Sequence, residues 1–302
     1  MIVCFVINSL LVDHNSIKEQ YDAVNSFGFD LHYFHTEHAS HTEELTKKAV
    51  ELGSNCIIAV GGDGTLNEVV NCLISNNYSD VNVALIPKGT GNDYTLSVNI
   101  PESPKELLES INKGCFIIVD VGKVIYKNKE KRYFINVADA GMGGEVTRKI
   151  TTSGNSLGKW VYYKAIFSTF FTFKRPRLEI ITDKETLTKK VLSVVIGKGI
   201  SFGGGYKVTY DAKLNDGKFF IVVVGDISIL SYLLKLPRIL SGKRINHPKV
   251  NYIRSSKITL NNLSNFDCFL ELDGEAGYSC PVVVECLPKK ISFLSYPNEV
   301  SQ

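Results

Sequence analysis

Apolar and polar positions alternate in blocks along the first 120 residues. Short apolar runs typical of buried strands alternate with stretches in which apolar residues recur every three or four positions, as on one face of a helix. The apolar runs lie near 2–8, 30–35, 56–60 and 83–86, and the helical stretches near 15–27, 42–52, 65–75 and 104–112. Strands that alternate with helices predict a parallel sheet in an α/β domain of residues 1–120.

The pattern changes near Phe116. Longer strand-like runs follow, with turn signals at Lys127–Glu130, Leu214–Gly217 and Asn261–Ser264 and helical stretches near 144–172 and 227–240. A chain of 302 residues is also longer than one common-sized domain. The sequence therefore predicts a second, β-rich domain over residues 121–288.

The most informative motif is the run Gly61-Gly62-Asp63-Gly64-Thr65, which joins an apolar strand to a helical stretch. Glycines let backbone amides approach an anion, Thr65 is a suitable helix N-cap, and a helix N-terminus favours negative charge. Asp63 would repel a phosphate unless a magnesium ion or a proton transfer involves it. The motif therefore indicates phosphoryl chemistry. The alternatives are an ordinary turn and, for Asp63, hydrogen bonds to backbone amides that brace the loop.

A second loop of similar composition, Pro87–Tyr94, follows the apolar strand Val83–Ile86. The carboxyl ends of parallel strands meet at one edge of a sheet, which is where ligands of open α/β sheets bind. We therefore expect the two loops to lie in one phosphate-binding site.

Composition narrows the classes of function. The net charge is +3, from 34 basic and 31 acidic residues, which gives no indication of a nucleic-acid partner. The longest uncharged apolar stretch, 165–173, is far short of the roughly 20 residues that span a bilayer. The first seven residues resemble a buried strand more than a signal peptide, and the seven cysteines lack CxxC spacing. We expect a cytoplasmic protein with reduced thiols and leave peripheral binding to a membrane open.

The two loops together resemble those of the diacylglycerol kinase catalytic-domain family, which includes soluble bacterial lipid kinases and is related to sphingosine and ceramide kinases. NAD kinases and 6-phosphofructokinases also carry GGDG loops, but the GTGND segment Gly89–Asp93 is similar to the lipid kinases. Three later segments also resemble the family, namely Ser201–Lys207, Asp211–Gly217 and Leu272–Glu275. The resemblance covers most of the chain.

The resemblance implies a fold and an activity. The fold is a doubly wound parallel-sheet domain of the NAD kinase and diacylglycerol kinase type, followed by a two-layer β sandwich, with residues 289–302 returning to the first domain. The active site of such proteins lies in the cleft between the domains. The activity is magnesium-dependent transfer of the γ-phosphoryl group of ATP to a hydroxyl of diacylglycerol or a related lipid.

The resemblance also assigns site residues. The nucleotide would contact Thr36, Gly61, Gly62, Asp63, Gly64, Thr65, Leu66, Asn67, Thr90, Asn92 and Asp93. Glu275 matches the general base of the bacterial members, whereas Asp63 matches the aspartate given that role in sphingosine kinases. We assign Glu275 as the base and Asp63 as the residue that organises magnesium and phosphate. The alternative for Glu275 is a carboxylate in a turn.

A structural magnesium site is implied in the same way. Its ligands would be the Asp216 carboxylate with the backbone carbonyls of Lys213 and Lys218. Oxygen ligands suit magnesium, but the flanking lysines weaken the case. The alternative is a turn without a metal.

Other features leave alternatives open. The segment Asn8-Ser9-Leu10-Leu11 lacks the proline and glycine that the family usually carries at this place. The apolar stretches 160–173 and 230–238 could contact a membrane surface or pack in a core. Two other functions therefore stay open, a soluble-substrate kinase of the NAD kinase type and a catalytically silent lipid- or nucleotide-binding protein. Nothing in the sequence decides which lipid is the acceptor, or between a monomer and a homodimer.

Overall fold

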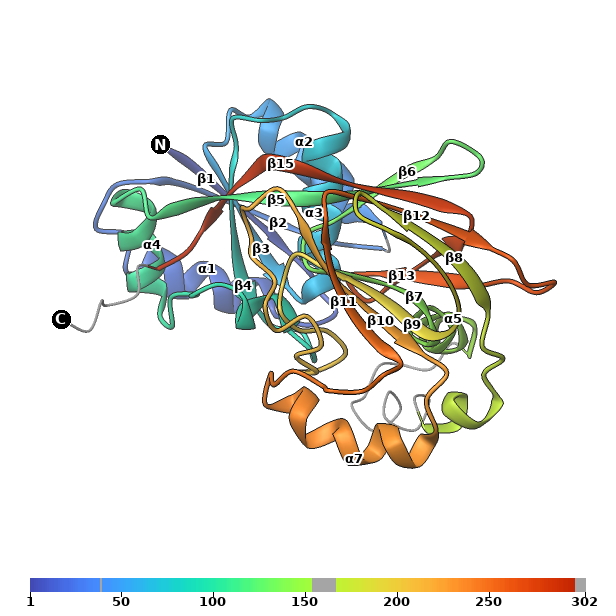
Figure 1. Ribbon diagram of the computed structural model, residues 1–302. Helices are drawn as coiled ribbons and strands as arrows, with labels where there is room; N and C mark the ends of the chain where they lie inside the picture. Colours follow the sequence, from blue (N-terminus) through green and yellow to red (C-terminus); the bar gives the residue numbers. More distant parts are fainter. Residues whose placement is uncertain (39, 154–166, 297–302) are drawn as a thin grey trace. The chain divides into compact units, whose positions relative to one another are not determined.

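The structure is a computed structural model that describes residues 1–38, 40–153 and 167–296. It divides into two compact units. Unit 1 contains residues 1–119 together with the C-terminal residues from Lys289, and unit 2 contains residues 120–288. Figure 1 labels the helices and strands of both units.

Unit 1 is built on a parallel sheet. The strands β1 (Ile2–Ile7), β2 (Asp30–His35), β3 (Cys56–Gly61) and β4 (Asn82–Pro87) lie in the order β4-β3-β1-β2. The end of β15 (Val282–Leu294) adds a parallel neighbour to β4 through Ser292 and Phe293. β3 is buried along its whole length, as its continuous apolar sequence requires for a central parallel strand.

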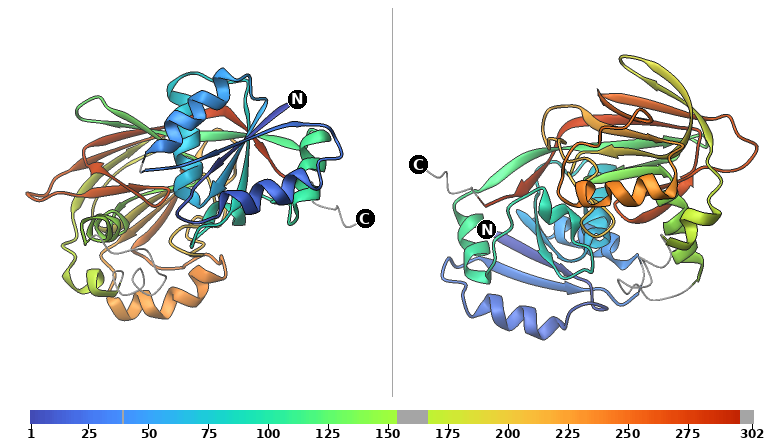
Figure 2. Two further views of the ribbon diagram at one scale, coloured as in Figure 1. Left: turned by 180° about the vertical axis from the view of Figure 1, so that it is seen from behind. Right: turned by 60° about the horizontal axis from the view of Figure 1, so that its bottom comes forward.

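Helices cover both faces of this sheet. One pair is α1 (His14–Asp22) with α4 (Pro104–Asn112), and the other is α2 (His41–Glu51) with α3 (Asp63–Ser75). The pairs lie on opposite faces in Figures 1 and 2, and the short helix η1 (Asp93–Leu96) follows β4. The doubly wound α/β prediction is therefore confirmed.

Two predicted helix boundaries were wrong. The helix predicted over 15–27 ends at Asp22, because the Asn25 side chain binds the backbone N–H and C=O of Phe29 and fixes a loop. The helix predicted from residue 65 begins at Asp63, with Gly62 as its N-cap. Thr65 is thus in the first turn and does not cap the helix.

Unit 2 is a sandwich of antiparallel sheets. One sheet contains β8 (Arg177–Thr182), β12 (Lys257–Asn262), β15, β5 (Phe116–Tyr126) and β6 (Lys131–Phe134). The other has the order β14 (Glu275–Ser279), β13 (Phe269–Leu272), β7 (Val137–Gly141), β9 (Thr186–Gly197), β10 (Phe219–Gly225) and β11 (Val250–Ser255). The predicted two-layer β sandwich is confirmed.

Strand β9 belongs to both sheets, and its sequence explains how. Residues 186–190 alternate between polar exposed and partly buried positions and pair with β8, whereas 191–197 are buried throughout and pair with β7 and β10. The inner faces enclose a core that includes Ile196, Phe219, Ile258 and Leu270. The outer face of the second sheet carries α5 (Met142–Ser153) and α7 (Ile229–Leu240).

The turn predictions had mixed outcomes. Residues Lys127–Glu130 join the paired strands β5 and β6, as predicted. Leu214–Gly217 instead lies within the long connection between β9 and β10, and Asn261–Ser264 precedes β13, which does not pair with β12. Part of the helical prediction over 144–172, including Trp160, lies outside the described residues. No helix among the described residues is long and apolar enough to cross a membrane.

Candidate functional site

The loops after β3 and β4 touch backbone to backbone. A Cβ atom on Gly89 would lie 2.5 Å from the Cα of Gly62, and one on Gly62 would lie 3.0 Å from the Cα of Gly89. The Lys88 N–H also donates a hydrogen bond of 2.7 Å to the Gly61 carbonyl. Any side chain at Gly89 would therefore push the loops apart, so the glycines are needed for the contact between the loops.

Asp63 holds the second loop against the first. Its Oδ2 accepts a hydrogen bond of 2.9 Å from the Asp93 N–H, and its Oδ1 accepts one of 3.1 Å from the Tyr94 N–H. Burial raises the pKa of the Asp63 carboxyl and the charge of Asp93 adds to this, although the amide hydrogen bonds oppose it. The bracing role considered for Asp63 in the sequence is thus present in the structure.

Asn92 closes the second loop on itself. Its backbone is left-handed, with φ of 52°, and its side chain binds the N–H of Gly89 at 3.0 Å and the C=O of Gly89 at 2.8 Å. Asp93 follows at the start of η1 and is buried, whereas Thr90 is exposed. Asn92 therefore shapes the loop, and Thr90 is its accessible hydroxyl.

The ends of the first three strands are joined by side-chain hydrogen bonds. The Ser9 N–H donates to the Thr36 hydroxyl at 3.1 Å, and the Asn8 amide donates to the Thr65 hydroxyl at 3.3 Å. Leu66 and Asn67 are buried in α3, so their side chains pack inside unit 1. The residues predicted to bind nucleotide in unit 1 thus lie together at the carboxyl edge of one sheet. Asn8 contributes a hydrogen bond there, although no proline or glycine lies beside it in the sequence.

Two carboxylates lie close together in this edge. A Cβ atom on Gly91 would lie 3.3 Å from Oδ2 of both Asp63 and Asp93. No group of three or more His, Cys, Asp or Glu side chains arranged for a metal occurs in residues 1–38, 40–153 and 167–296. Because magnesium in phosphotransfer sites is held by one or two carboxylates together with substrate phosphates, Asp63 and Asp93 are a donor set that fits it.

Glu275 opens β14 in unit 2 and is exposed. It follows a two-residue turn in which Asp273 and Gly274 have φ of 49° and 86°. The Asp273 carboxylate accepts hydrogen bonds of 2.8, 3.0 and 2.9 Å from the N–H groups of Ile135, Asn136 and Val137. Asp273 thereby fixes the turn, and the turn presents Glu275 to solvent.

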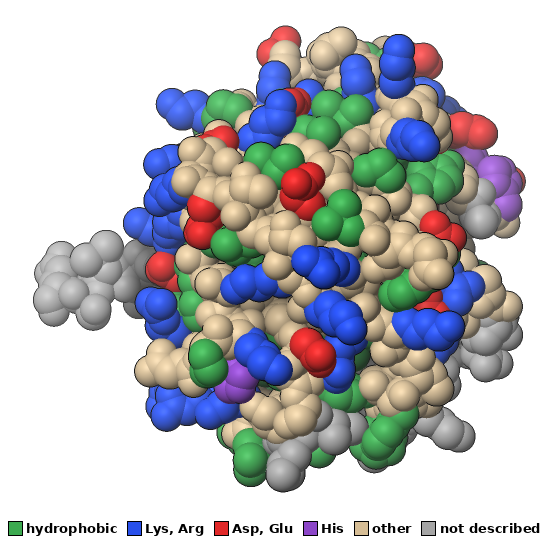
Figure 3. All heavy atoms as spheres, turned by 45° about the vertical axis from the view of Figure 1, so that its right-hand side comes forward, with side chains coloured by type: hydrophobic (Ala, Val, Ile, Leu, Met, Phe, Trp, Pro, Cys, Tyr) green, Lys and Arg blue, Asp and Glu red, His purple; other side chains and the backbone are tan. Residues whose placement is uncertain are grey.

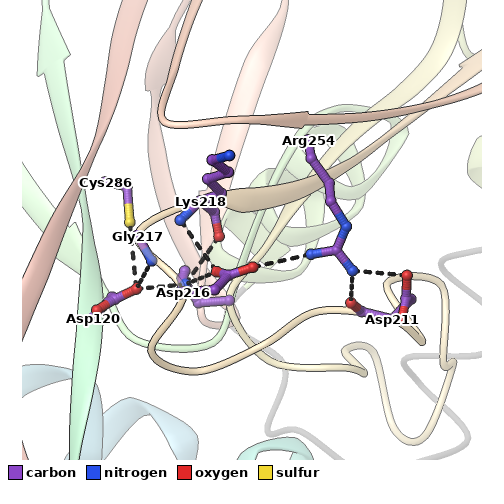
Figure 4. A network of polar contacts seen from close by, with 8 residues as sticks. Asp120, Asp211, Asp216, Gly217, Lys218, Arg254 and Cys286 are labelled. Atoms are coloured by element: carbon purple, nitrogen blue, oxygen red, sulfur yellow. Dashed lines mark hydrogen bonds and ion pairs between the residues drawn. The ribbon is translucent and has the colours of Figure 1, made fainter.

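Asp216, the predicted metal ligand, is already bound to two cations. Its Oδ1 lies 3.1 Å from the Lys198 ammonium, and its Oδ2 lies 3.0 Å from the Arg254 guanidinium. Figure 4 shows Arg254 between Asp216 and Asp211, and Asp120 beside the N–H of Gly217.

The Lys198 ammonium is the centre of this network. It donates to the Lys218 carbonyl at 2.9 Å and to the Asp120 carboxylate at 2.8 Å, and the side chains of both Lys198 and Asp120 are fully buried. Lys213, whose carbonyl was the third predicted ligand, is exposed. Two of the three predicted ligands therefore already bind an ammonium ion, so the donor set does not fit a magnesium ion.

Sequence reasoning missed Lys198 and Asp120. A lysine directly after the buried run 191–197 is the one available signal, because a buried lysine needs carboxylate partners. The partners themselves lie 78 and 18 residues away in the chain, so only the fold identifies them.

We expect Asp63→Asn to lower the free energy of unfolding by about 1–3 kcal/mol, because an amide side chain can accept from only one of the two backbone N–H groups and leaves the other unpaired. Urea unfolding followed by circular dichroism measures the change. Glu51→Gln, on an exposed position of α2, is the control and should unfold like the parent protein. Equal stability of Asp63→Asn and the parent would contradict the bracing role.

We expect Lys198→Met to lower the free energy of unfolding by about 3–5 kcal/mol, because it leaves a buried carboxylate without its cation. Lys213→Met removes an exposed lysine from the same region and should cost less than about 0.5 kcal/mol. If both substitutions had the same small effect in urea unfolding, the Lys198 network would not support the fold.

Chelation should leave the unfolding temperature of the nucleotide-free protein unchanged, because a lysine and an arginine neutralise Asp216 without a metal ion. Differential scanning calorimetry in magnesium and in EDTA makes the comparison. Destabilisation by EDTA that added magnesium reverses would place a structural metal ion in the protein after all.

Comparison with known proteins agrees with this geometry. Residues 12–124 match the Diacylglycerol kinase catalytic domain family, and residues 136–295 match the YegS C-terminal NAD kinase beta sandwich-like domain. A diacylglycerol kinase of Staphylococcus saprophyticus is 30% identical over 276 residues, which cover 90% of this chain and 87% of that protein. One of Staphylococcus aureus strain JH9 is 31% identical over 277 residues, which cover 90% of this chain and 84% of that protein.

Solved structures show the same fold. The crystal structure of a diacylglycerol kinase from Bacillus anthracis strain Sterne covers 99% of this chain and 98% of its own, with a TM-score of 0.72 and 20% identity. Another crystal structure from that strain gives a TM-score of 0.78 at 23% identity with the same coverage. From the family matches and the curated relatives, the chain belongs to the diacylglycerol kinase family and is a lipid kinase.

Proposed function

We propose that this protein transfers the γ-phosphoryl group of ATP to a hydroxyl of diacylglycerol or a related lipid, with magnesium. The observation that carries the proposal is the clamp between the two glycine loops, in which Gly62 meets Gly89 and Asp63 binds the amides of Asp93 and Tyr94. A rigid pair of glycine loops at the carboxyl edge of a parallel sheet is a suitable cradle for a nucleotide triphosphate.

The donor phosphates would bind at the loops of unit 1. The N-terminal turn of α3, which begins at Asp63, offers backbone amides and the positive end of the helix dipole. Thr90, exposed beside Gly89, would donate its hydroxyl to a phosphate oxygen. Asp63 and Asp93 would hold a magnesium ion, which when bound offsets the negative charge of the phosphates. Thr36 would keep its bracing contact with Ser9 at the rim of this site.

Glu275 would act as the general base. It would accept the proton of the lipid hydroxyl while that oxygen forms its bond to the γ-phosphorus, and the bond from this phosphorus to the bridging oxygen of ADP would break. The turn fixed by Asp273 keeps the first residue of β14 in one place, which favours this role. Glu275 is also exposed, which allows its carboxyl group to release the proton to water after the transfer.

The acceptor lipid would be reached at a membrane surface. On the face in Figure 3, Lys and Arg side chains are interspersed with acidic and apolar side chains. Basic side chains at such a surface favour contact with anionic lipid headgroups over insertion into the bilayer.

We expect Glu275→Gln to lower kcat for lipid phosphorylation by about 100-fold or more, because an amide cannot accept the proton. The assay follows the label of γ-³²P-ATP, with magnesium, into diacylglycerol in mixed micelles. Glu185→Gln, an exposed glutamate in another turn of unit 2, is the matched control and should keep the parent rate. A Glu275→Gln protein that retains the parent rate would exclude Glu275 as the base.

A further inference from the structure

The Lys198 ammonium lies in a cage of three oxygens in unit 2. It donates to the Asp120 carboxylate at 2.8 Å, to the Asp216 carboxylate at 3.1 Å and to the Lys218 carbonyl at 2.9 Å. An ammonium group has three donors and no acceptor, so these contacts use its whole hydrogen-bonding capacity. The cage therefore consists of two anionic oxygens and one neutral oxygen that converge on a single cation.

The cage oxygens come from two separate segments of the chain. Asp120 lies in β5, whereas Asp216 and Lys218 lie in the connection that leads from β9 into β10. Figure 4 shows these three residues in one network. The Asp120 N–H also donates a hydrogen bond of 2.7 Å to the Leu214 carbonyl of the same connection. The caged cation thus lies at the point where the connection is held against β5.

Backbone amides orient the cage without help from the Lys198 side chain. The Gly217 N–H donates at 2.7 Å to Oδ2 of Asp120, the oxygen that also binds the ammonium. The Lys218 N–H donates at 3.1 Å to Oδ1 of Asp216, again the oxygen on the ammonium. Second hydrogen bonds of this kind hold the ligand oxygens of metal sites in place. We therefore expect both oxygens to stay directed at the same point when the lysine side chain is shortened.

The charges of the cage require a cation inside it. The side chains of Lys198 and Asp120 are fully buried, and that of Asp216 is 24% exposed. Arg254 binds the other oxygen of Asp216 at 3.0 Å and also binds Asp211 at 2.7 Å. Loss of the ammonium would take from the buried Asp120 its cation partner Lys198, and an uncompensated buried charge destabilises a fold strongly. Carboxylate and carbonyl oxygens are also the ligands that calcium and magnesium take in proteins.

We propose that Lys198 is a covalently attached substitute for a divalent metal ion, and that the cage of Asp120, Asp216 and the Lys218 carbonyl becomes a calcium or magnesium site once the ammonium is removed. The lysine thereby holds the connection between β9 and β10 in place at any concentration of free metal ion. The inference does not rest on the proposed kinase function, because it concerns the protein without nucleotide.

The test empties the cage with Lys198→Ala. The short side chain leaves room for a metal ion and its water ligands, so millimolar calcium or magnesium should raise the unfolding temperature of the nucleotide-free variant by about 5 °C or more relative to EDTA. Differential scanning calorimetry measures the shift. The unfolding temperature of the parent protein should be the same in all three solutions. A variant that responds to neither metal would overturn the proposal.

Refolding keeps the test decisive if Lys198→Ala is unfolded in EDTA. The variant is then diluted from urea into calcium, magnesium or EDTA, and its fold is followed by circular dichroism. Calcium or magnesium should restore the spectrum of the parent protein. A spectrum that neither metal restores would overturn the proposal.

Three further comparisons locate the effect. Lys198→Met is the matched control, because its side chain fills the place of the ammonium with apolar atoms, and stabilisation of this variant by either metal would contradict the proposal. Adding Asp216→Asn to Lys198→Ala should abolish the response to metal, and a response that survives would place the ion elsewhere and overturn the proposal. Stabilisation of Lys198→Ala by ammonium chloride, with none by calcium or magnesium, would show a site for ammonium ions alone and would also overturn it.

Discussion

The contact between Gly62 and Gly89 is the constraint on which the rest of unit 1 depends. The two residues follow adjacent parallel strands, and their backbones approach more closely than any Cβ atom would allow. Once the loops meet in this way, the Asp63 carboxylate reaches the amides of Asp93 and Tyr94, and the helix that begins at Asp63 points its N-terminus at the same edge of the sheet. The proposed phosphate site is therefore a consequence of backbone packing and does not depend on a side chain that contacts a ligand.

Carboxylates in the described part of the chain lie in three different environments. Asp63 and Asp273 accept hydrogen bonds from backbone amides of neighbouring loops, and each fixes a segment that carries a proposed site residue. Asp120 and Asp216 neutralise buried or partly buried cations, which removes the need for a metal ion beside them. Asp139 accepts hydrogen bonds from the Gly143 N–H and the Ser193 hydroxyl with one oxygen, and its other oxygen is buried without a hydrogen-bond partner among the described residues.

Much of the fold could be predicted from the sequence because it is encoded locally. The four parallel strands of unit 1 follow from short apolar runs, and strand Asp30–His35 lies where the pattern places it. The start of α3 could not be found in this way, because Gly62 caps the helix without a side chain. The hairpins predicted at 214–217 and 261–264 were wrong for a related reason. A turn sequence does not specify which strands pair.

The candidate site could be predicted from the sequence only where a recognisable motif marks it. The glycine loops stand out in the sequence, but the hydrogen bond between Asn8 and Thr65 joins the end of β1 to the first turn of α3, 57 residues away. The Lys198 network and the hydrogen bonds of Asp139 depend on strand pairing in unit 2, because Ser193 and Asp139 meet only when β9 lies beside β7. Such tertiary contacts leave no periodic signal in the chain.

We expect the clamped glycine loops to serve phosphoryl transfer to a lipid acceptor and not to a soluble one. The most direct test gives the protein γ-³²P-ATP and magnesium together with diacylglycerol micelles and NAD in the same reaction, and then separates the organic and aqueous phases. We expect the label to enter the organic phase as phosphorylated lipid. Label in NADP, with none in the lipid fraction, would contradict it.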